Sequence, residues 1–253
     1  MENIRIIPRL DIKGPNVVKG IHAEGLRVVG NPKELAYKYY HEGADEIMYM
    51  DIVASLYQRN LDFDLLKSVS EDIFIPFTVG GGIRSIHDIN NVLRAGADKI
   101  AINTFAVQHP EFLVEAVKKF GSQCIVLSIE AKKIGEGKWE AYTDGGRERT
   151  YRDAMDWAKK AIELGVGEIM ITSIDKEGTK KEYDHDLIKA ITAFSPIPVI
   201  AHGGAGEMET IYDLIANDIP DAVAASSVFH YNDYTISDLK NYLRKKNINI
   251  RIK

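Results

Sequence analysis

Two acidic residues stand where apolar runs of the sequence end. Asp11 follows such a run near the N-terminus, and Glu130 closes another in the middle of the chain. Carboxyl side chains can give and take protons, so two of them facing one substrate are suited to general acid and base catalysis. Each residue alone is equally suited to capping a loop or to pairing with Lys13 or Lys132. The case for catalysis therefore depends on where the fold places the two carboxyls.

Two glycine-rich segments follow other apolar runs. Residues 80–82 are consecutive glycines with an Asn-Thr pair at 103–104, and 203–206 contain three glycines with a Ser-Ser pair at 226–227. Glycine turns let backbone N–H groups approach a phosphate, and a following helix N-terminus favours negative charge. One such turn is often only conformational, but two indicate a substrate with a phosphate at each end. The predicted phosphate- and substrate-binding residues are Lys19, Gly82, Asn103, Thr104, Glu177, Gly178, His202, Gly203, Gly204, Ser226 and Ser227.

An internal repeat connects these features. Residues 43–48 match 165–170, and the glycine pair 81–82 matches 203–204 at the same separation along the chain. The segment around Asp11 matches the segment around Glu130 at nearly that separation. Self-similarity at about half the chain length predicts two similar four-strand halves. It also predicts that the two carboxyls lie on opposite sides of one site.

Short apolar runs alternate with helical patterns along the whole chain, which is typical of parallel strands covered by helices. We predict an α/β protein, a single (β/α)8 barrel domain spanning 1–253 and built from two half-barrels, with its active site at the carboxyl ends of the strands. The segment 132–150 is predicted to be a long charged loop over that end, either a mobile lid or a solvated insertion. A helix is predicted over 151–164. The expected strands are 4–10, 46–51, 75–79, 99–102, 125–130, 168–173, 198–201 and 222–225.

Composition excludes several classes of protein. The 253 residues are 45% hydrophobic and 27% charged, with a net charge of −5, which fits a globular chain without a broad cationic surface for nucleic acid. No apolar stretch has the length of a membrane helix or a secretory signal, so we expect a cytoplasmic protein. The seven histidines and the single cysteine, Cys124, show no metal-ligand spacing, and no dinucleotide fingerprint is present. We predict no metal and no cofactor.

Charged residues also cluster at the opposite end of the predicted barrel. Side chains alternate along a strand, so if Asp11 faces the barrel axis, Arg9, Ile7 and Arg5 face it too. Arg5 then lies near the closed end, where three other strands begin with charged residues. The resulting set is Arg5, Glu46, Lys99 and Glu168. It is interpreted either as a structural plug of ion pairs or as a gate for something small.

Several motifs together are familiar: 5–8 (RIIP), 17–20 (VVKG), 77–83 (FTVGGGI), 96–99 (GADK), 102–104 (INT), 172–175 (TSID) and 228–230 (VFH). With Asp11, they resemble the cyclase subunits of imidazole glycerol phosphate synthase over essentially the whole chain. The resemblance implies an ammonia-using lyase or synthase of histidine biosynthesis with Asp11 and Glu130 as the acid and base. It also implies a glutaminase subunit docked at the barrel floor in a heterodimer, ammonia passing through the gate of four charges, and a substrate with two phosphates.

The sequence departs from that family at three positions. Glu130 replaces the usual Asp, Arg9 replaces a small residue, and His202 precedes the second glycine turn. These features look more like a paralogous group linked to forming acetamidino groups on surface-polysaccharide sugars, again with a glutaminase partner. A phosphosugar aminoaldose isomerase, which needs no ammonia, and a non-enzymatic interaction subunit are the remaining alternatives.

Overall fold

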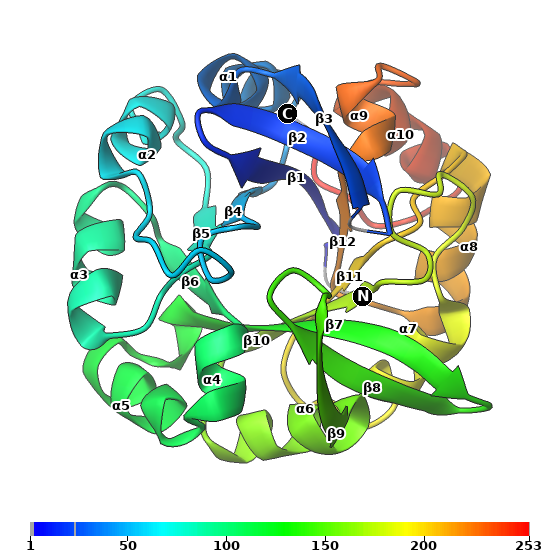
Figure 1. The fold of residues 1–253 in the computed structure, drawn as a ribbon. Helices are drawn as coiled ribbons and strands as arrows, with labels where there is room; N and C mark the ends of the chain where they lie inside the picture. The colour runs from blue at the N-terminus through cyan, green and yellow to red at the C-terminus, as the bar shows by residue number, and fades with distance from the viewer. Residues whose placement is uncertain (1–2, 23, 253) are drawn as a thin grey trace.

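Eight parallel strands form a closed barrel in the computed structural model, seen end-on in Figure 1. The structure describes residues 3–22 and 24–252, and Met1, Glu2, Ala23 and Lys253 lie outside the described part. Pairing of β10 with β7 completes the ring, which confirms the predicted barrel. In ring order the strands are β1 (Arg5–Lys13), β4 (Ile47–Asp51), β5 (Phe77–Gly80), β6 (Lys99–Ile102), β7 (Ile125–Gly135), β10 (Glu168–Ser173), β11 (Val199–His202) and β12 (Ala222–Ala225).

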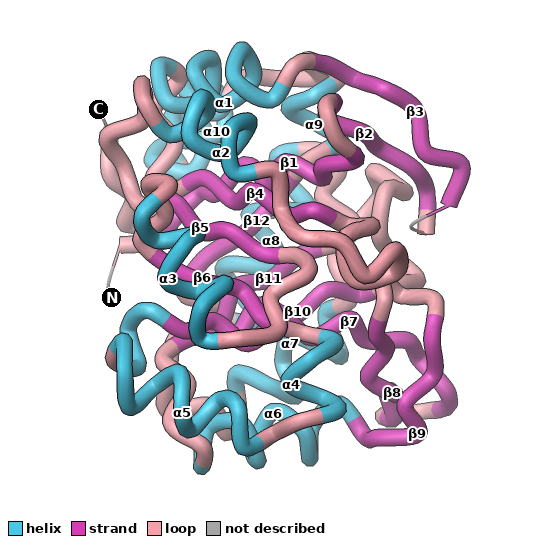
Figure 2. The backbone as a smooth tube through the Cα atoms, turned by 60° about the vertical axis from the view of Figure 1, so that its left-hand side comes forward, coloured by secondary structure: helices cyan, strands magenta, loops and turns pink. Residues whose placement is uncertain are grey.

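Helices cover the outside of the barrel (Figure 2). Sequence signals fix several of their starts: Asn31 caps α1 with Pro32 in its first turn, and the Ser85 side chain accepts from Asp88 N–H at α3. No helix of the described residues is long and apolar enough to cross a membrane. The helices are α1 (Pro32–His41), α2 (Phe63–Ser70), α3 (Ile86–Arg94), α4 (Thr104–Gln108), α5 (Glu111–Phe120), α6 (Ala154–Glu163), α7 (His185–Thr192), α8 (Met208–Asp218), α9 (Ser227–His230) and α10 (Ile236–Lys245), with a 3-10 turn at Ser122–Cys124.

The apolar core has two parts, one on each face of the barrel wall. The larger lies between strands and helices and includes Leu10, Phe77 and Trp157. The smaller fills the barrel interior with Ile7, Met48, Met50, Ala101, Val126, Met170, Ile200, Ala222 and Ala224. Layers of inward side chains make such a barrel a packed core rather than an open pore. Polar groups at the two ends are therefore separated by an apolar layer.

Two antiparallel hairpins extend the barrel, and the sequence predicted neither. β2 (Asn16–Ile21) pairs with β1 and β3 (Glu24–Gly30), while β8 (Lys138–Thr143) pairs with β7 and β9 (Glu148–Asp153). The prediction of a loop over 132–150 was wrong, and α6 begins three residues later than the predicted start at 151. Because β1 and β7 continue into these hairpins, Asp11 and Glu130 lie within strands and not at their ends. That the chain forms one domain, and that it is built from two similar half-barrels, are still predictions from the sequence.

Candidate active site

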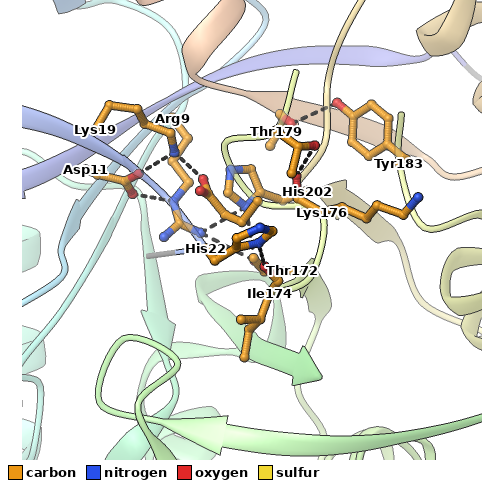
Figure 3. Close-up of polar contacts among 12 residues, drawn as sticks. Arg9, Asp11, Lys19, His22, Thr172, Ile174, Lys176, Thr179, Tyr183 and His202 are labelled. Atoms are coloured by element: carbon orange, nitrogen blue, oxygen red, sulfur yellow. Dashed lines mark hydrogen bonds and ion pairs between the residues drawn. The ribbon is translucent and has the colours of Figure 1, made fainter. Parts of the chain in front are cut away.

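Asp11 lies between two cations at the carboxyl end of the barrel, which we call the mouth. Its Oδ1 accepts from Arg9 Nε and its Oδ2 from Lys19 Nζ, each at 2.8 Å (Figure 3). Lys19 also pairs with Glu177. All four side chains are buried. Burial disfavours a charged carboxyl, but the charges of Arg9 and Lys19 outweigh it and hold the pKa of Asp11 well below its ordinary value. Asp11 is a permanent anion at neutral pH.

Arg9 reaches from β1 toward the strands on one side of the barrel. Its Nη1 lies 3.4 Å from Thr172 Oγ1 on β10 and 3.3 Å from His202 Nδ1 on β11, and these two side chains are 3.1 Å apart (Figure 3). Burial and the charge of Arg9 hold the pKa of His202 well below its ordinary value, so His202 is neutral. The expectation that Arg9 faces the axis is confirmed. His202 supports Arg9 and also lines the cleft beside the second glycine turn.

Glu130 stands across the barrel from Asp11, because β7 is the fourth strand from β1 around a ring of eight in either direction. Its Oε2 accepts from Asn103 Nδ2 at 3.0 Å and from Gly146 N–H at 2.8 Å. Burial raises the pKa of Glu130 to about 7 against the opposing charge of Arg9. The two carboxyls line one small cavity of about 30 Å³. The structure thus brings them together as the sequence predicted.

A cavity of about 390 Å³ opens beside the first glycine turn. It is lined by Arg9, Gly82, Asn103, Thr104 and Glu130, among others. Thr104 Oγ1 also accepts from Asp144 N–H at 3.1 Å, so the β8–β9 hairpin forms part of this wall. Sequence reasoning missed Gly146 and Asp144 as site residues, because the hairpin that carries them was predicted as a loop.

The second glycine turn lines a narrow cleft of about 10 Å³. The Ser226 hydroxyl is buried there and has no hydrogen-bond partner among the described residues. A buried, unpaired hydroxyl is costly, and it is available to a ligand oxygen. The predicted binding residues that the structure gathers around this cleft are Lys19, Glu177, Gly178, His202, Gly203, Gly204, Ser226 and Ser227.

Backbone conformation explains why glycine occupies both turns. Gly81 and Gly204 each have a φ of +108°, which side-chain-bearing residues rarely adopt. A Cβ atom at Gly81 would lie 2.2 Å from Asp51 O, and one at Gly204 would lie 2.0 Å from Glu182 O. Both turns therefore need glycine to pass close to neighbouring backbone.

At the opposite end, the floor, four side chains form a closed ring of ion pairs. Arg5 Nη1 and Lys99 Nζ each lie 2.8 Å from Glu46 Oε2; Lys99 Nζ lies 2.9 Å from Glu168 Oε2, and Arg5 also pairs with Glu168. Glu46 also accepts from Thr78 Oγ1 at 2.5 Å. The predicted floor set is thus assembled, and we call Arg5, Glu46, Lys99 and Glu168 the floor ring.

Other candidate groups lie away from this chemistry. Among the described residues, no cluster of three His, Cys, Asp or Glu side chains could hold a metal ion. Cys124 is buried before β7, and burial raises the pKa of its thiol, which disfavours the reactive thiolate. Cys124 is thus part of the apolar core between strands and helices.

The amino-acid sequence was compared with families and proteins that are already known. Residues 5–235 match the family model described as histidine biosynthesis protein. The chain belongs to this family. A member of the histidine biosynthesis family from Legionella pneumophila, named imidazole glycerol phosphate synthase subunit HisF, is 56% identical over 209 residues. The match covers 83% of this chain and 99% of that protein. The resemblance inferred from the sequence is confirmed.

Proposed function

We propose that this chain is an ammonia-using cyclase of the imidazole glycerol phosphate synthase type, acting in histidine biosynthesis. The observation that carries the proposal is the placement of Asp11 and Glu130 on opposite strands of the barrel, where they line one cavity at the mouth. The similarity to the Legionella HisF protein over most of the chain supports the same activity. A cytoplasmic setting is part of the proposal, since the chain has one cysteine and no disulfide.

The two glycine turns are proposed to hold the two ends of a doubly phosphorylated substrate. The larger cavity offers Gly82, Asn103 and Thr104, and the narrow cleft offers the unpaired Ser226 hydroxyl. Lys19 lines the same cleft and is the cation proposed to face a phosphate there. A substrate held at both ends places its middle over the two carboxyls, which are proposed to be the catalytic pair.

A glutaminase subunit is the proposed source of ammonia. The name of the Legionella relative describes a subunit, which implies a partner subunit in that protein. The single cysteine of this chain is buried, so a thiolate that hydrolyses glutamine must come from elsewhere. We propose that the partner docks at the floor as a heterodimer and that ammonia enters through the floor ring.

A second candidate function is the modification of a surface-polysaccharide sugar, in which an acetamido group becomes acetamidino. Buried Arg9 favours it, because this guanidinium stands inside the barrel where the cyclase family usually has a small residue. Glu130 favours it as well, since its longer side chain shifts the carboxyl by about one bond length.

One assay separates these functions. The purified chain is incubated with an ammonium salt and the doubly phosphorylated precursor of imidazole glycerol phosphate, and product is measured. Ammonium-dependent product formation is the expected result. Turnover without ammonium favours an isomerase, and neither turnover nor binding of the precursor overturns the proposed cyclase.

A further inference from the structure

The two carboxyls differ in how many of their oxygens are free. Both oxygens of Asp11 are taken by cations, Oδ1 by Arg9 and Oδ2 by Lys19. Glu130 uses Oε2 for two neutral donors, Asn103 and Gly146, while its Oε1 takes no hydrogen bond from the residues that the structure describes. Glu130 lines both the larger cavity and the small one. Of the two carboxyls, only Glu130 has an oxygen that accepts no hydrogen bond from the described residues.

Arg9 is held in place from several sides. Nε pairs with Asp11, and Nη1 lies near Thr172, His202 and the Met170 sulfur. The side chain is 6% exposed, so its only direct carboxylate partner among the described residues, Asp11, is buried with it. Releasing Asp11 would leave Arg9 as a buried cation without a carboxylate partner, which is strongly unfavourable.

The groups that face Glu130 include cations, anions and neutral donors. Arg9 and Asp11 face it from β1, and Asp144 faces it from the β8–β9 hairpin, with the Gly146 N–H beside it. Lys19 and Glu177 form part of the wall of the small cavity and pair with each other. Asn103, directly after β6, and Thr172, on β10, are uncharged. No cation contacts the Glu130 carboxyl within the described chain.

We propose that Arg9 is a positioning residue that gives the two carboxyls unequal roles: it fixes Asp11 as a permanent anion, and Glu130 alone exchanges a proton with the substrate. This inference rests on the proposed function, in which both carboxyls lie under the substrate. The proton leaves the substrate for Glu130 Oε1, which becomes the neutral acid, and returns from the same atom.

The ionisation of the two groups supports this division. Arg9 and Lys19 overcome burial and lower the pKa of Asp11, whereas burial raises the pKa of Glu130 to about 7. A group with a pKa near the working pH is present both as acid and as base, which is the most effective condition for proton transfer. Asp11 is a weak base because protonation would cost its two ion pairs.

The test follows each carboxyl directly in the intact chain. Side-chain carboxyl carbons of Asp and Glu are labelled with carbon-13, and their NMR shifts are recorded against pH, with Asp11→Asn and Glu130→Gln used for assignment. We expect Glu130 to titrate with a midpoint at about pH 7. Asp11 should still be ionised at pH 3.8, which is the ordinary pKa of an Asp carboxyl. A Glu130 midpoint at its ordinary 4.5, or an Asp11 midpoint at or above 3.8, overturns the proposal.

Variants of Arg9 test the cause. Arg9→Met removes the charge but keeps an unbranched side chain, so the midpoints of both Asp11 and Glu130 should rise. Arg9→Lys restores one positive charge and should move both midpoints back toward wild type. Arg59→Met, which removes a guanidinium 2.7 Å from Asp51, is the matched control and should change neither midpoint. Unchanged midpoints in Arg9→Met overturn the assignment to Arg9.

A kinetic measurement separates a positioning role from a structural one. The pH profile of ammonium-driven kcat should follow a single ionisation at the Glu130 midpoint and should shift in parallel with it in Arg9→Met. A uniform loss of rate with an unshifted profile contradicts the positioning role. The NMR titration needs no turnover, so an inactive chain refutes the proposed cyclase while the titration still decides the roles of the carboxyls.

Discussion

At the scale of single residues, Glu130 and Asp11 should respond differently to removal of their charge. Glu130→Gln keeps an amide oxygen for Asn103 and Gly146, so the fold is retained, and we expect turnover to fall by about 10²–10⁴-fold, as for loss of an acid or base group. Asp11→Asn should lower turnover as strongly and also lower stability, because Arg9 and Lys19 become buried cations without their shared anion. Turnover and thermal unfolding measured on both variants test this contrast. Wild-type turnover in either variant removes that residue from the mechanism.

Shortening the side chain at 130 separates the two candidate functions. Glu130→Asp restores the residue that the cyclase family usually has at this position. If the chain is a cyclase with a displaced carboxyl, the variant should form imidazole glycerol phosphate faster than wild type. If the chain modifies another substrate, the variant should show no gain. The measurement is ammonium-driven product formation at saturating precursor.

The raised pKa of Glu130 predicts a pH dependence of stability. The folded protein holds this proton up to about pH 7, whereas the ordinary value for the unfolded chain is 4.5. Stability from this group is therefore full below 4.5 and is lost as pH rises through 7. Each unit of pKa difference is worth about 1.4 kcal/mol. The change in the free energy of unfolding that Glu130→Gln causes should therefore be more stabilising at pH 8 than at pH 5, by about 1–3 kcal/mol. Glu111→Gln, exposed on α5, is the control and should show no such difference in denaturant unfolding.

At the scale of elements, the second glycine turn should not tolerate a side chain at Gly204. Gly204→Ala forces a Cβ within 2.0 Å of Glu182 O at a φ of +108°, so we expect the second turn to shift and substrate KM to rise at least about tenfold. Gly135→Ala is the matched control, since no atom lies within 4 Å of its Cβ position and its φ is not positive. Crystals soaked in phosphate give a second readout. Wild type should bind an anion beside Ser226 and the variant should not, and equal occupancy in both would refute the second site.

Among the elements, the barrel strands could be predicted from the sequence and the β8–β9 hairpin could not. The barrel strands were readable because each is a short apolar run between helical patterns. The β8–β9 hairpin was not, because its charged residues satisfy one another in space: Arg149 pairs with buried Glu140 at 2.7 Å, and Trp139 donates to Asp184. Lysines, glycines and acidic residues over 132–150 therefore resembled a solvated loop. Asp11 and Glu130 were found because polar residues are rare in apolar strands, whereas Gly146 has no side chain to signal its bond to Glu130.

At the scale of the whole molecule, the floor and the mouth are separate charged layers with the apolar interior between them. The floor ring lies below Ile7, Met170 and their neighbours, and Arg9 lies above them. In the proposed function, external ammonia enters through the mouth and meets neither the floor ring nor the apolar layer. Ammonia released by a partner at the floor must cross both. The two routes should therefore respond differently to the same substitution.

Lys99→Ala tests the route through the floor. Lys99 bridges Glu46 and Glu168 at 2.8 and 2.9 Å, so its removal opens one side of the floor ring and leaves two carboxylates to Arg5 alone. With the proposed glutaminase subunit bound, we expect glutamine-driven turnover to fall more than ammonium-driven turnover, because only the former would use the floor. The same pair of rates in Arg9→Ala shows whether this guanidinium limits passage: a gain confined to the glutamine-driven rate places the restriction at Arg9. Equal losses of both rates in Lys99→Ala would mean that the ring is structural, and glutamine hydrolysis by this chain alone would contradict the two-subunit proposal.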